Sequence, residues 1–206
     1  MNQRACLNSI FLFVVASLAL SSVALGDVAT LAEDCDDCHG KDGVSEWSDV
    51  PTIAGISAYA HSDALFIFLD RVRPCVSSEY RRGDTSREET DMCEIVDDLT
   101  EDEIEEIAEY YAAKPFVPAK QEFDAAKAVA GKKIHDKECE KCHTDGGTNP
   151  EEDASIVAGQ WTEYLQQSFD AYMSGDRDQP KKMKEKMDPL SDEDIDALLN
   201  YYASQQ

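Results

Sequence analysis

The alternation of apolar and polar residues predicts helices along the chain, and the clearest two form an internal repeat. Residues 99–112, LTEDEIEEIAEYYA, match residues 190–203, LSDEDIDALLNYYA. In each copy, apolar residues recur at helical spacing behind a Thr or Ser that is followed three positions later by an acid. This capping-box pattern is typical of a helix N-terminus. We therefore expect two equivalent amphipathic helices, each closing a domain of its own.

The segment between the repeats is expected to be a linker. Residues 113–123 contain Pro115 and Pro118, which interrupt the helical pattern. We predict an all-α protein with a first domain over residues 27–116 and a second domain over residues 117–206.

The first 26 residues have the order of a secretory signal peptide. A single positive charge, Arg4, precedes an apolar run over residues 10–20, and small residues follow up to Gly26. The run is shorter than the roughly 20 residues that a membrane-spanning helix needs. Cleavage after Ala24 or Gly26 and export are therefore favoured over an uncleaved anchor, and no stable membrane span is expected.

The charge balance narrows the possible partners. The chain has 43 acidic and 19 basic residues, a net charge of −24 at pH 7. Nucleic acid and anionic lipid would repel such a protein, whereas a basic protein surface would attract it. With 42% apolar residues, the chain can still bury a core.

Four of the seven cysteines lie in two copies of a C-x-x-C-H motif, CDDCH at 35–39 and CEKCH at 139–143. This is the signature of haem c attachment. Two thiols on one helical turn can each form a thioether with a vinyl group of the same haem, and the adjoining His can bind the iron. The predicted thioether residues are Cys35, Cys38, Cys139 and Cys142, and the predicted proximal ligands are His39 and His143.

Two other interpretations of the motifs fit less well. A zinc site would pair two C-x-x-C knuckles about 15–20 residues apart, whereas these lie 104 positions apart. A thioredoxin-like redox motif needs a βαβ setting, and no alternating strand pattern lies near either copy. We therefore expect two covalently attached haem c groups.

The repeat also suggests the second axial ligands. Met92 lies seven residues before Leu99, and Met183 lies seven residues before Leu190. A thioether sulfur is a soft iron ligand that raises the haem potential. We predict Met92 and Met183 as ligands, with Met187 as the local competitor of Met183.

The remaining Met and His candidates are given structural roles. Met173 has no counterpart in the first half and is expected to pack in the core. His61 is an alternative axial ligand of the first domain, although a polar surface role is favoured. His135 is expected on the helix of Cys139 and exposed.

The first domain carries an arginine-rich insertion. The span from His39 to Met92 is 13 residues longer than that from His143 to Met183, and five of the seven arginines fall between residues 71 and 92. A solvated loop is the favoured interpretation, and pairing with haem propionates or a partner subunit is the alternative. Cys75 and Cys93 bound this span; a disulfide is favoured over two free thiols.

Each half resembles a class I cytochrome c: a helix, C-x-x-C-H, a loop, a Met and a closing helix with paired tyrosines. The tandem resembles cytochrome c4 and, more closely, the dihaem cytochrome subunit of flavocytochrome c sulfide dehydrogenase. The closer resemblance rests on KPFVPAKQEFDAA, HDKECEKCHTDGG, VAGQWTEYLQ and the ending YYASQQ; in the first half it rests on CDDCHGKDG, PTIAG and the place of Met92.

The resemblance implies two tandem class I cytochrome c domains in a periplasmic electron-transfer protein. An FAD-containing flavoprotein partner would oxidise sulfide and pass electrons through this chain to a soluble acceptor cytochrome c. The alternatives are a stand-alone cytochrome c4-like carrier feeding a terminal oxidase, and a dihaem peroxidase. Since the sequence has no nucleotide-binding glycine loop and no nucleophile–base pair, we expect no catalytic site in the chain itself.

The family pattern also implies a partner for each proximal His. The carbonyl of Pro51 is expected to accept a hydrogen bond from the His39 ring. Ser155 stands where the second half would have this Pro, so the partner of His143 is left open.

Overall fold

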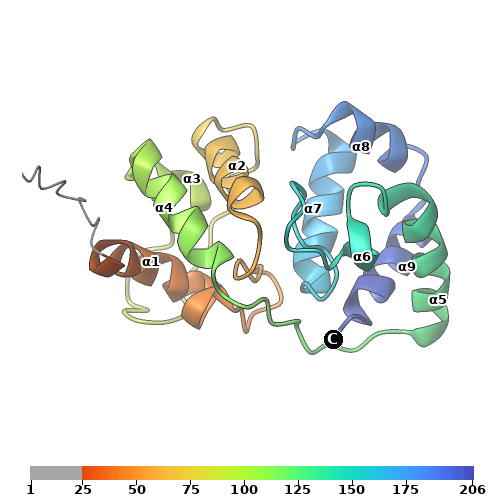
Figure 1. The fold of residues 1–206 in the computed structure, drawn as a ribbon, viewed down its shortest axis with the longest axis horizontal. Coiled ribbons are helices and arrows are strands. Elements are labelled where there is room, and N and C mark those ends of the chain that lie inside the picture. The colour runs from red at the N-terminus through yellow and green to blue at the C-terminus, as the bar shows by residue number, and fades with distance from the viewer. Residues whose placement is uncertain (1–24) are drawn as a thin grey trace, which may run out of the picture.

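The computed structural model describes residues 25–206, so the predicted signal peptide, apart from its last two residues, lies outside the described part. Two groups of helices lie beside each other, α1–α4 and α5–α9, and the chain between them runs along one side of both (Figure 1). Apart from one antiparallel bridge between Ser78 and Thr90, residues 25–206 contain no β-structure. The all-α prediction is confirmed.

The first group consists of α1 (Leu25–His39), α2 (Ala58–Leu69), α3 (Met92–Asp97) and α4 (Glu101–Ala112), with a short 3₁₀ turn, η1 (Lys41–Gly43), behind α1. Helix α4 packs against α1 and α2, and α2 also contacts α3. The buried cluster between them is Ala32, Leu65, Phe68, Cys93, Val96, Ile104, Ile107 and Tyr111.

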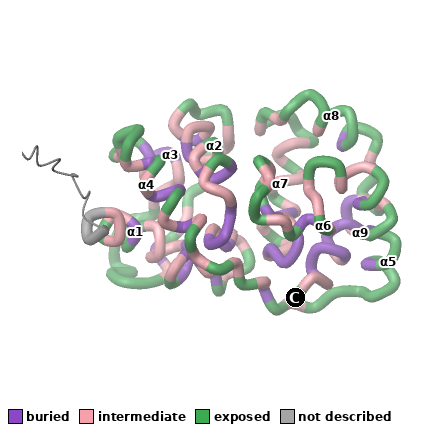
Figure 2. The backbone as a smooth tube through the Cα atoms, in the orientation of Figure 1, coloured by how far each residue is buried: buried purple, intermediate pink, exposed green. Residues whose placement is uncertain are grey.

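The second group begins with α5 (Ala125–Ile134), which continues into the π-helical turn η2 (His135–Cys139). The short α6 (Thr144–Gly147), α7 (Thr162–Ser174), α8 (Lys181–Met187) and α9 (Asp192–Ala203) follow. Helix α9 contacts both α5 and α7 and is largely buried, whereas α5 and α8 are mostly exposed (Figure 2). The buried cluster is Ala158, Leu165, Ile195, Leu198, Leu199, Tyr201 and Tyr202.

The predicted repeat helices are α4 and α9, and both begin with a complete capping box. The hydroxyl of Thr100 accepts from the backbone N–H of Glu103, whose carboxylate accepts from the N–H of Thr100. Ser191 and Asp194 make the same reciprocal pair in front of α9. Each box satisfies two backbone donors that the helix leaves unpaired.

The predicted linker has no regular secondary structure, and it lies against the second group of helices. The Ala119 N–H donates to the carbonyl of Gly159, and the Gln121 side chain donates to the carbonyl of Gln160. These contacts tie the linker to residues of the second half. The domain boundary at residues 116 and 117 stays a prediction.

The two halves are joined through Gln160, which is 2% exposed. Its side-chain oxygen accepts from the Thr52 N–H at 3.1 Å, and its amide nitrogen donates to the Thr52 carbonyl. Next to it, the Trp161 indole donates to the carbonyl of Ser45 at 3.1 Å. A single side chain thus satisfies both backbone groups of a buried residue in the other half.

Replacing Gln160 with leucine is therefore expected to destabilise the protein by about 2 kcal/mol, because it leaves two buried backbone groups of Thr52 unpaired. Chemical denaturation of the holoprotein measures this loss. Gln166→Leu is the matched control. The Gln166 side chain bonds only Asp170, and both residues lie at the surface of α7. Equal stabilities of the two variants would contradict the interpretation.

Candidate haem sites

All eight predicted haem residues line one continuous cavity that extends through both halves. Its volume is about 1040 Å³, just above the roughly 300–1000 Å³ typical of small-molecule sites. The residues brought together are Cys35, Cys38, His39 and Met92 from the first half, and Cys139, Cys142, His143 and Met183 from the second. Most of the side chains that line the cavity are apolar, as a porphyrin requires.

The first motif forms the last turn of α1 and ends in a fixed histidine. His39 is 7% exposed, and its Nδ1 donates to the carbonyl of Pro51 at 2.9 Å. This bond confirms the expected role of Pro51, and it leaves Nε2 as the acceptor nitrogen. Burial lowers the pKa of His39, which favours the neutral ring that binds iron.

A carboxylate inside the first motif ties the closing helix to it. Asp36 accepts from the hydroxyl of Tyr111 on α4 at 2.8 Å and from the N–H groups of Asp42 and Gly43. Gly43 has a φ of +75°, and a Cβ there would lie 2.7 Å from the Tyr111 ring. Only glycine fits this turn, because a side chain would collide with the tyrosine that the carboxylate holds.

Three of the four motif cysteines have the pKa shift of a buried thiol, whereas Cys142 is exposed. Burial raises the pKa of Cys35 to about 12, and burial also raises the pKa of Cys38 and Cys139. A redox dithiol or a thiolate metal site requires the opposite shift. The four motif cysteines form no disulfide with one another, so each is free to attach to a haem.

The second motif begins at the last residue of the π-helical turn, and its histidine is held less completely. Burial lowers the pKa of His143; the backbone carbonyl of Ser155 faces the ring and opposes this shift. However, the His143 Nδ1 is buried without a completed hydrogen bond. Ser155 follows His143 by the same twelve positions that separate Pro51 from His39, so its carbonyl occupies the corresponding place.

The two Met candidates of the second half differ in burial. Met187 is 5% exposed, and the residue at its place in the first half, Val96, is fully buried in the core. Met183 and its counterpart Met92 are half-buried. Both halves therefore place a buried residue, which also lines the cavity, four positions after the predicted Met ligand.

The prediction that His135 is exposed is wrong. The ring is 0% exposed: Nε2 donates to the Glu140 carboxylate at 2.8 Å, and Nδ1 lies 3.0 Å from the Tyr202 hydroxyl. In the first half, the hydroxyl of Tyr111 donates directly to Asp36. The corresponding residues of the second half are Tyr202 and Glu140, and the His135 ring lies between them and bonds both. The sequence signal is a His four residues before the first motif cysteine, but only the position of Tyr202 reveals its role.

The favoured surface role of His61 is also wrong, as is the core role of Met173. His61 on α2 is 5% exposed and lines the cavity; burial lowers the pKa of its ring to about 4, and its Nδ1 has no partner. Its ring lies 5.6 Å from that of Tyr111. Met173 on α7 is 43% exposed.

The insertion of the first half is tied down rather than loosely solvated. Cys75 and Cys93 form the expected disulfide, with a Cα–Cα distance of 5.7 Å. Four of its five arginines reach carboxylates of the first half: Arg71 to Asp97, Arg81 to Asp49, Arg82 to Glu46, and Arg87 to Asp34 and Asp37. Arg73 is the exception.

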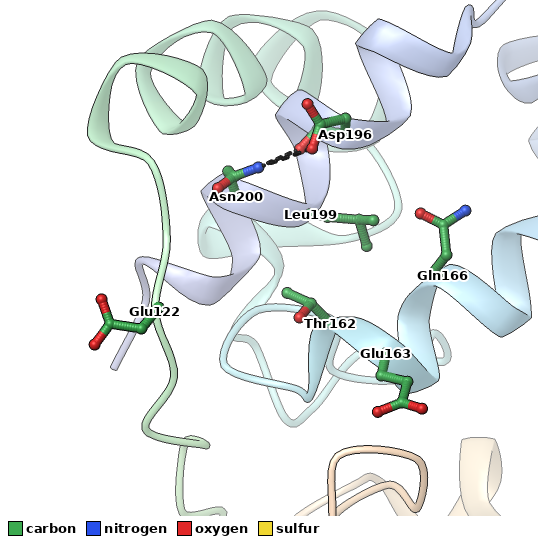
Figure 3. Close-up of a pocket in the computed structure, with 7 residues that line it drawn as sticks. All are labelled: Glu122, Thr162, Glu163, Gln166, Asp196, Leu199 and Asn200. Carbon is green, nitrogen blue, oxygen red and sulfur yellow. Dashed lines mark hydrogen bonds between the residues drawn. The ribbon is translucent and has the colours of Figure 1, made fainter.

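A second, smaller hollow of about 300 Å³ lies between α7, α9 and the linker (Figure 3). Apart from the exposed Glu122, its polar side chains are already bonded within the protein. Asn200 donates to Asp196, which also pairs with Lys127, and Glu163 accepts from Ser48. This hollow therefore offers no free donor set for a ligand.

Comparison with known proteins agrees with this geometry. Residues 126–201 match the family model described as cytochrome c oxidase, cbb3-type, subunit III. No curated protein matches the chain. Among solved structures, cytochrome c4 from Pseudomonas stutzeri is similar, with 23% identity, a TM-score of 0.68, and coverage of 87% of this chain and 97% of that chain.

Two further structures are similar over the same extent. Cytochrome c4 from Acidithiobacillus ferrooxidans has 22% identity and a TM-score of 0.67, covering 84% of this chain and 99% of that chain. Thiosulfate dehydrogenase (TsdBA) from Marichromatium purpuratum has 22% identity and a TM-score of 0.68; the match covers 87% of this chain and 40% of that chain.

The chain thus has the fold of a dihaem class I cytochrome c, and its two C-x-x-C-H sites fit two covalently attached haem c groups. The arrangement of its two halves is similar to that of the two cytochrome c4 structures. Within residues 25–206, no helix combines the length and apolar character needed to cross a bilayer.

Proposed function

We propose that this chain is a periplasmic electron carrier with two haem c groups. Cys35 and Cys38 attach the first and Cys139 and Cys142 the second. The axial ligands are His39 with Met92, and His143 with Met183. The observation that carries this proposal is that all eight side chains line one cavity, although the two motifs that supply six of them lie 104 positions apart.

A bound haem supplies one-electron chemistry at its iron. The protein contributes orientation and exclusion of water. Pro51 holds the His39 ring through Nδ1, and the buried clusters of both halves close the apolar sides of the cavity. With a His and a Met held to each iron, no position would be left for sulfide, peroxide or oxygen, so electron transfer is favoured over a peroxidase.

Haem content and carbon monoxide binding test this proposal. We expect holoprotein from a host that matures c-type cytochromes to carry the mass of two haems, and the reduced protein to bind carbon monoxide poorly. A colourless protein would overturn haem attachment. Rapid binding of carbon monoxide by one haem would instead favour the peroxidase.

At the finer level, we propose that the chain is the cytochrome subunit of a flavocytochrome c sulfide dehydrogenase. Electrons would pass from an FAD subunit through this chain to a soluble acceptor cytochrome c. Support comes from the sequence resemblance of the linker and second half, and from the similar fold within a longer chain named thiosulfate dehydrogenase. A pull-down from the native periplasm, analysed for bound flavin, tests this assignment.

A stand-alone cytochrome c4-like carrier that feeds a terminal oxidase is the second candidate. It is favoured by coverage of nearly the whole length of two cytochrome c4 chains. Purification from the native source without flavin, together with rapid oxidation by membranes that contain a terminal oxidase, would support this alternative.

The acidic surface predicts docking to a basic patch on the acceptor. With a net charge of −24, electrostatic attraction should accelerate encounter at low salt. We expect the second-order rate of acceptor reduction to fall about tenfold or more as salt rises from about 10 mM to 0.5 M. Stopped-flow measurement at several salt concentrations checks this, and a rate independent of salt would contradict it.

A further inference from the structure

Two arginines from different halves face the cavity without an acidic partner. Arg73 lies in the insertion of the first half, and Arg177 lies in the loop after α7. Each of the other four arginines in residues 25–206 pairs with a carboxylate, whereas neither of these two does. This is unusual in a chain with 43 acidic and 19 basic residues.

Aromatic rings hold both guanidinium groups in place. Arg73 lies over the Phe68 ring at 4.4 Å and donates across the boundary to the hydroxyl of Tyr164 at 3.1 Å. Arg177 lies over the Tyr172 ring at 4.3 Å, and its Nε is buried without a hydrogen-bond partner. All five side chains line the cavity.

The two guanidinium groups make this part of the cavity positive. Burial lowers the pKa of Arg177, and the charge of Arg73 lowers it further. Burial would raise the pKa of Tyr164, but Arg73 and Arg177 bring it down to about 8. The acids at this end, Asp63 and Asp178, are exposed and bridge to neither arginine. Both arginines are half-buried. A cation that is partly withdrawn from water without a counter-charge is unfavourable, so the site favours an anion.

We propose that Arg73 and Arg177 bind haem propionates where the two halves meet. This inference rests on the proposed function, because propionates are the carboxylates that a haem in this cavity carries. Guanidinium groups bind carboxylates through paired hydrogen bonds, and their planar shape suits stacking on Phe68 and Tyr172. Because Arg73 reaches Tyr164 in the other half, one cluster serves the boundary between both haem sites.

The proposal has a consequence for the reduction potentials. A fixed positive charge near a haem disfavours the ferric state, which carries one more positive charge than the ferrous state. Removing either guanidinium charge should therefore lower at least one of the two potentials. A role confined to packing would change stability and leave the potentials in place.

The test compares four holoproteins with the wild type: Arg177→Gln, Arg177→Lys, Arg73→Gln and the control Arg71→Gln. Arg71 is exposed and already pairs with Asp97. Potentiometric titration is expected to show about a tenfold change in one redox equilibrium for each of Arg177→Gln and Arg73→Gln, which is about 59 mV for one electron. Arg177→Lys, which keeps the charge, should recover most of this shift, and the control should show none.

The shifts in potential should persist at about 1 M salt, where the Debye length is about 3 Å. Such salt screens charges on the surface, but it does not screen charges inside the cavity to the same extent. Unchanged potentials in glutamine variants that carry both haems would overturn the inference and leave the proposed function intact. Failure of the wild type to bind haem would overturn the proposed function itself. If Arg177→Gln yields no holoprotein, the reduction potentials of Arg73→Gln decide whether the inference stands.

Discussion

Replacing Met183 with alanine is expected to leave one of the two haems high-spin and to lower its potential by about 100 mV or more, since axial ligands set haem potentials over about 0.8 V. Met187→Ala should leave both haems low-spin. The reason is the repeated arrangement: Met183 corresponds to the half-buried Met92, whereas Met187 corresponds to Val96, which is fully buried in the first core. Visible and electron paramagnetic resonance spectra with potentiometry measure both outcomes.

The same pair of substitutions separates ligation from packing by their effect on stability. Met187→Ala empties a core position, for which a loss of about 2–5 kcal/mol is usual. In the first half, Met92→Ala should likewise give a high-spin haem, whereas Val96→Ala should lower the stability and leave the haem low-spin. A high-spin haem in Met187→Ala, with an unchanged spectrum in Met183→Ala, would transfer the ligand role to Met187.

Gly131→Ala is expected to destabilise the protein by about 3 kcal/mol, the upper end of the cost of overpacking. At an exposed helical position the same change would stabilise by about 1 kcal/mol. The sign is reversed because a Cβ on Gly131 would lie 1.9 Å from the carbonyl oxygen of Ala197. This contact is with backbone, so no side chain can move aside, and α5 and α9 must separate.

Denaturant unfolding of the holoprotein, followed by circular dichroism, measures this loss. Ala130→Gly is the control, because Ala130 is exposed on the same helix and the change should cost only about 1 kcal/mol. If Gly131→Ala were as stable as the wild type, the close crossing of α5 and α9 would be incorrect.

Features that depend on neighbours in the chain were predictable from the sequence. Periodicity and the capping boxes located α4 and α9, and the matched offsets of Met92 and Met183 placed both beside the cavity. The cysteine pairs show why: the spacing of two thiols and a histidine on one helical turn is a local property. The pairing of Cys75 with Cys93 followed from counting the cysteines that the motifs left over.

The errors concern residues whose environment comes from distant segments. His135 and His61 look like ordinary polar residues along the chain, yet folding brings Tyr202 against the first and Tyr111 beside the second. The unpaired charges of Arg73 and Arg177 likewise exist only where the two halves meet. Local spacing determines which helices form and which side chains share a turn. Burial and charge pairing depend on contacts between residues far apart in the sequence, which no local pattern records.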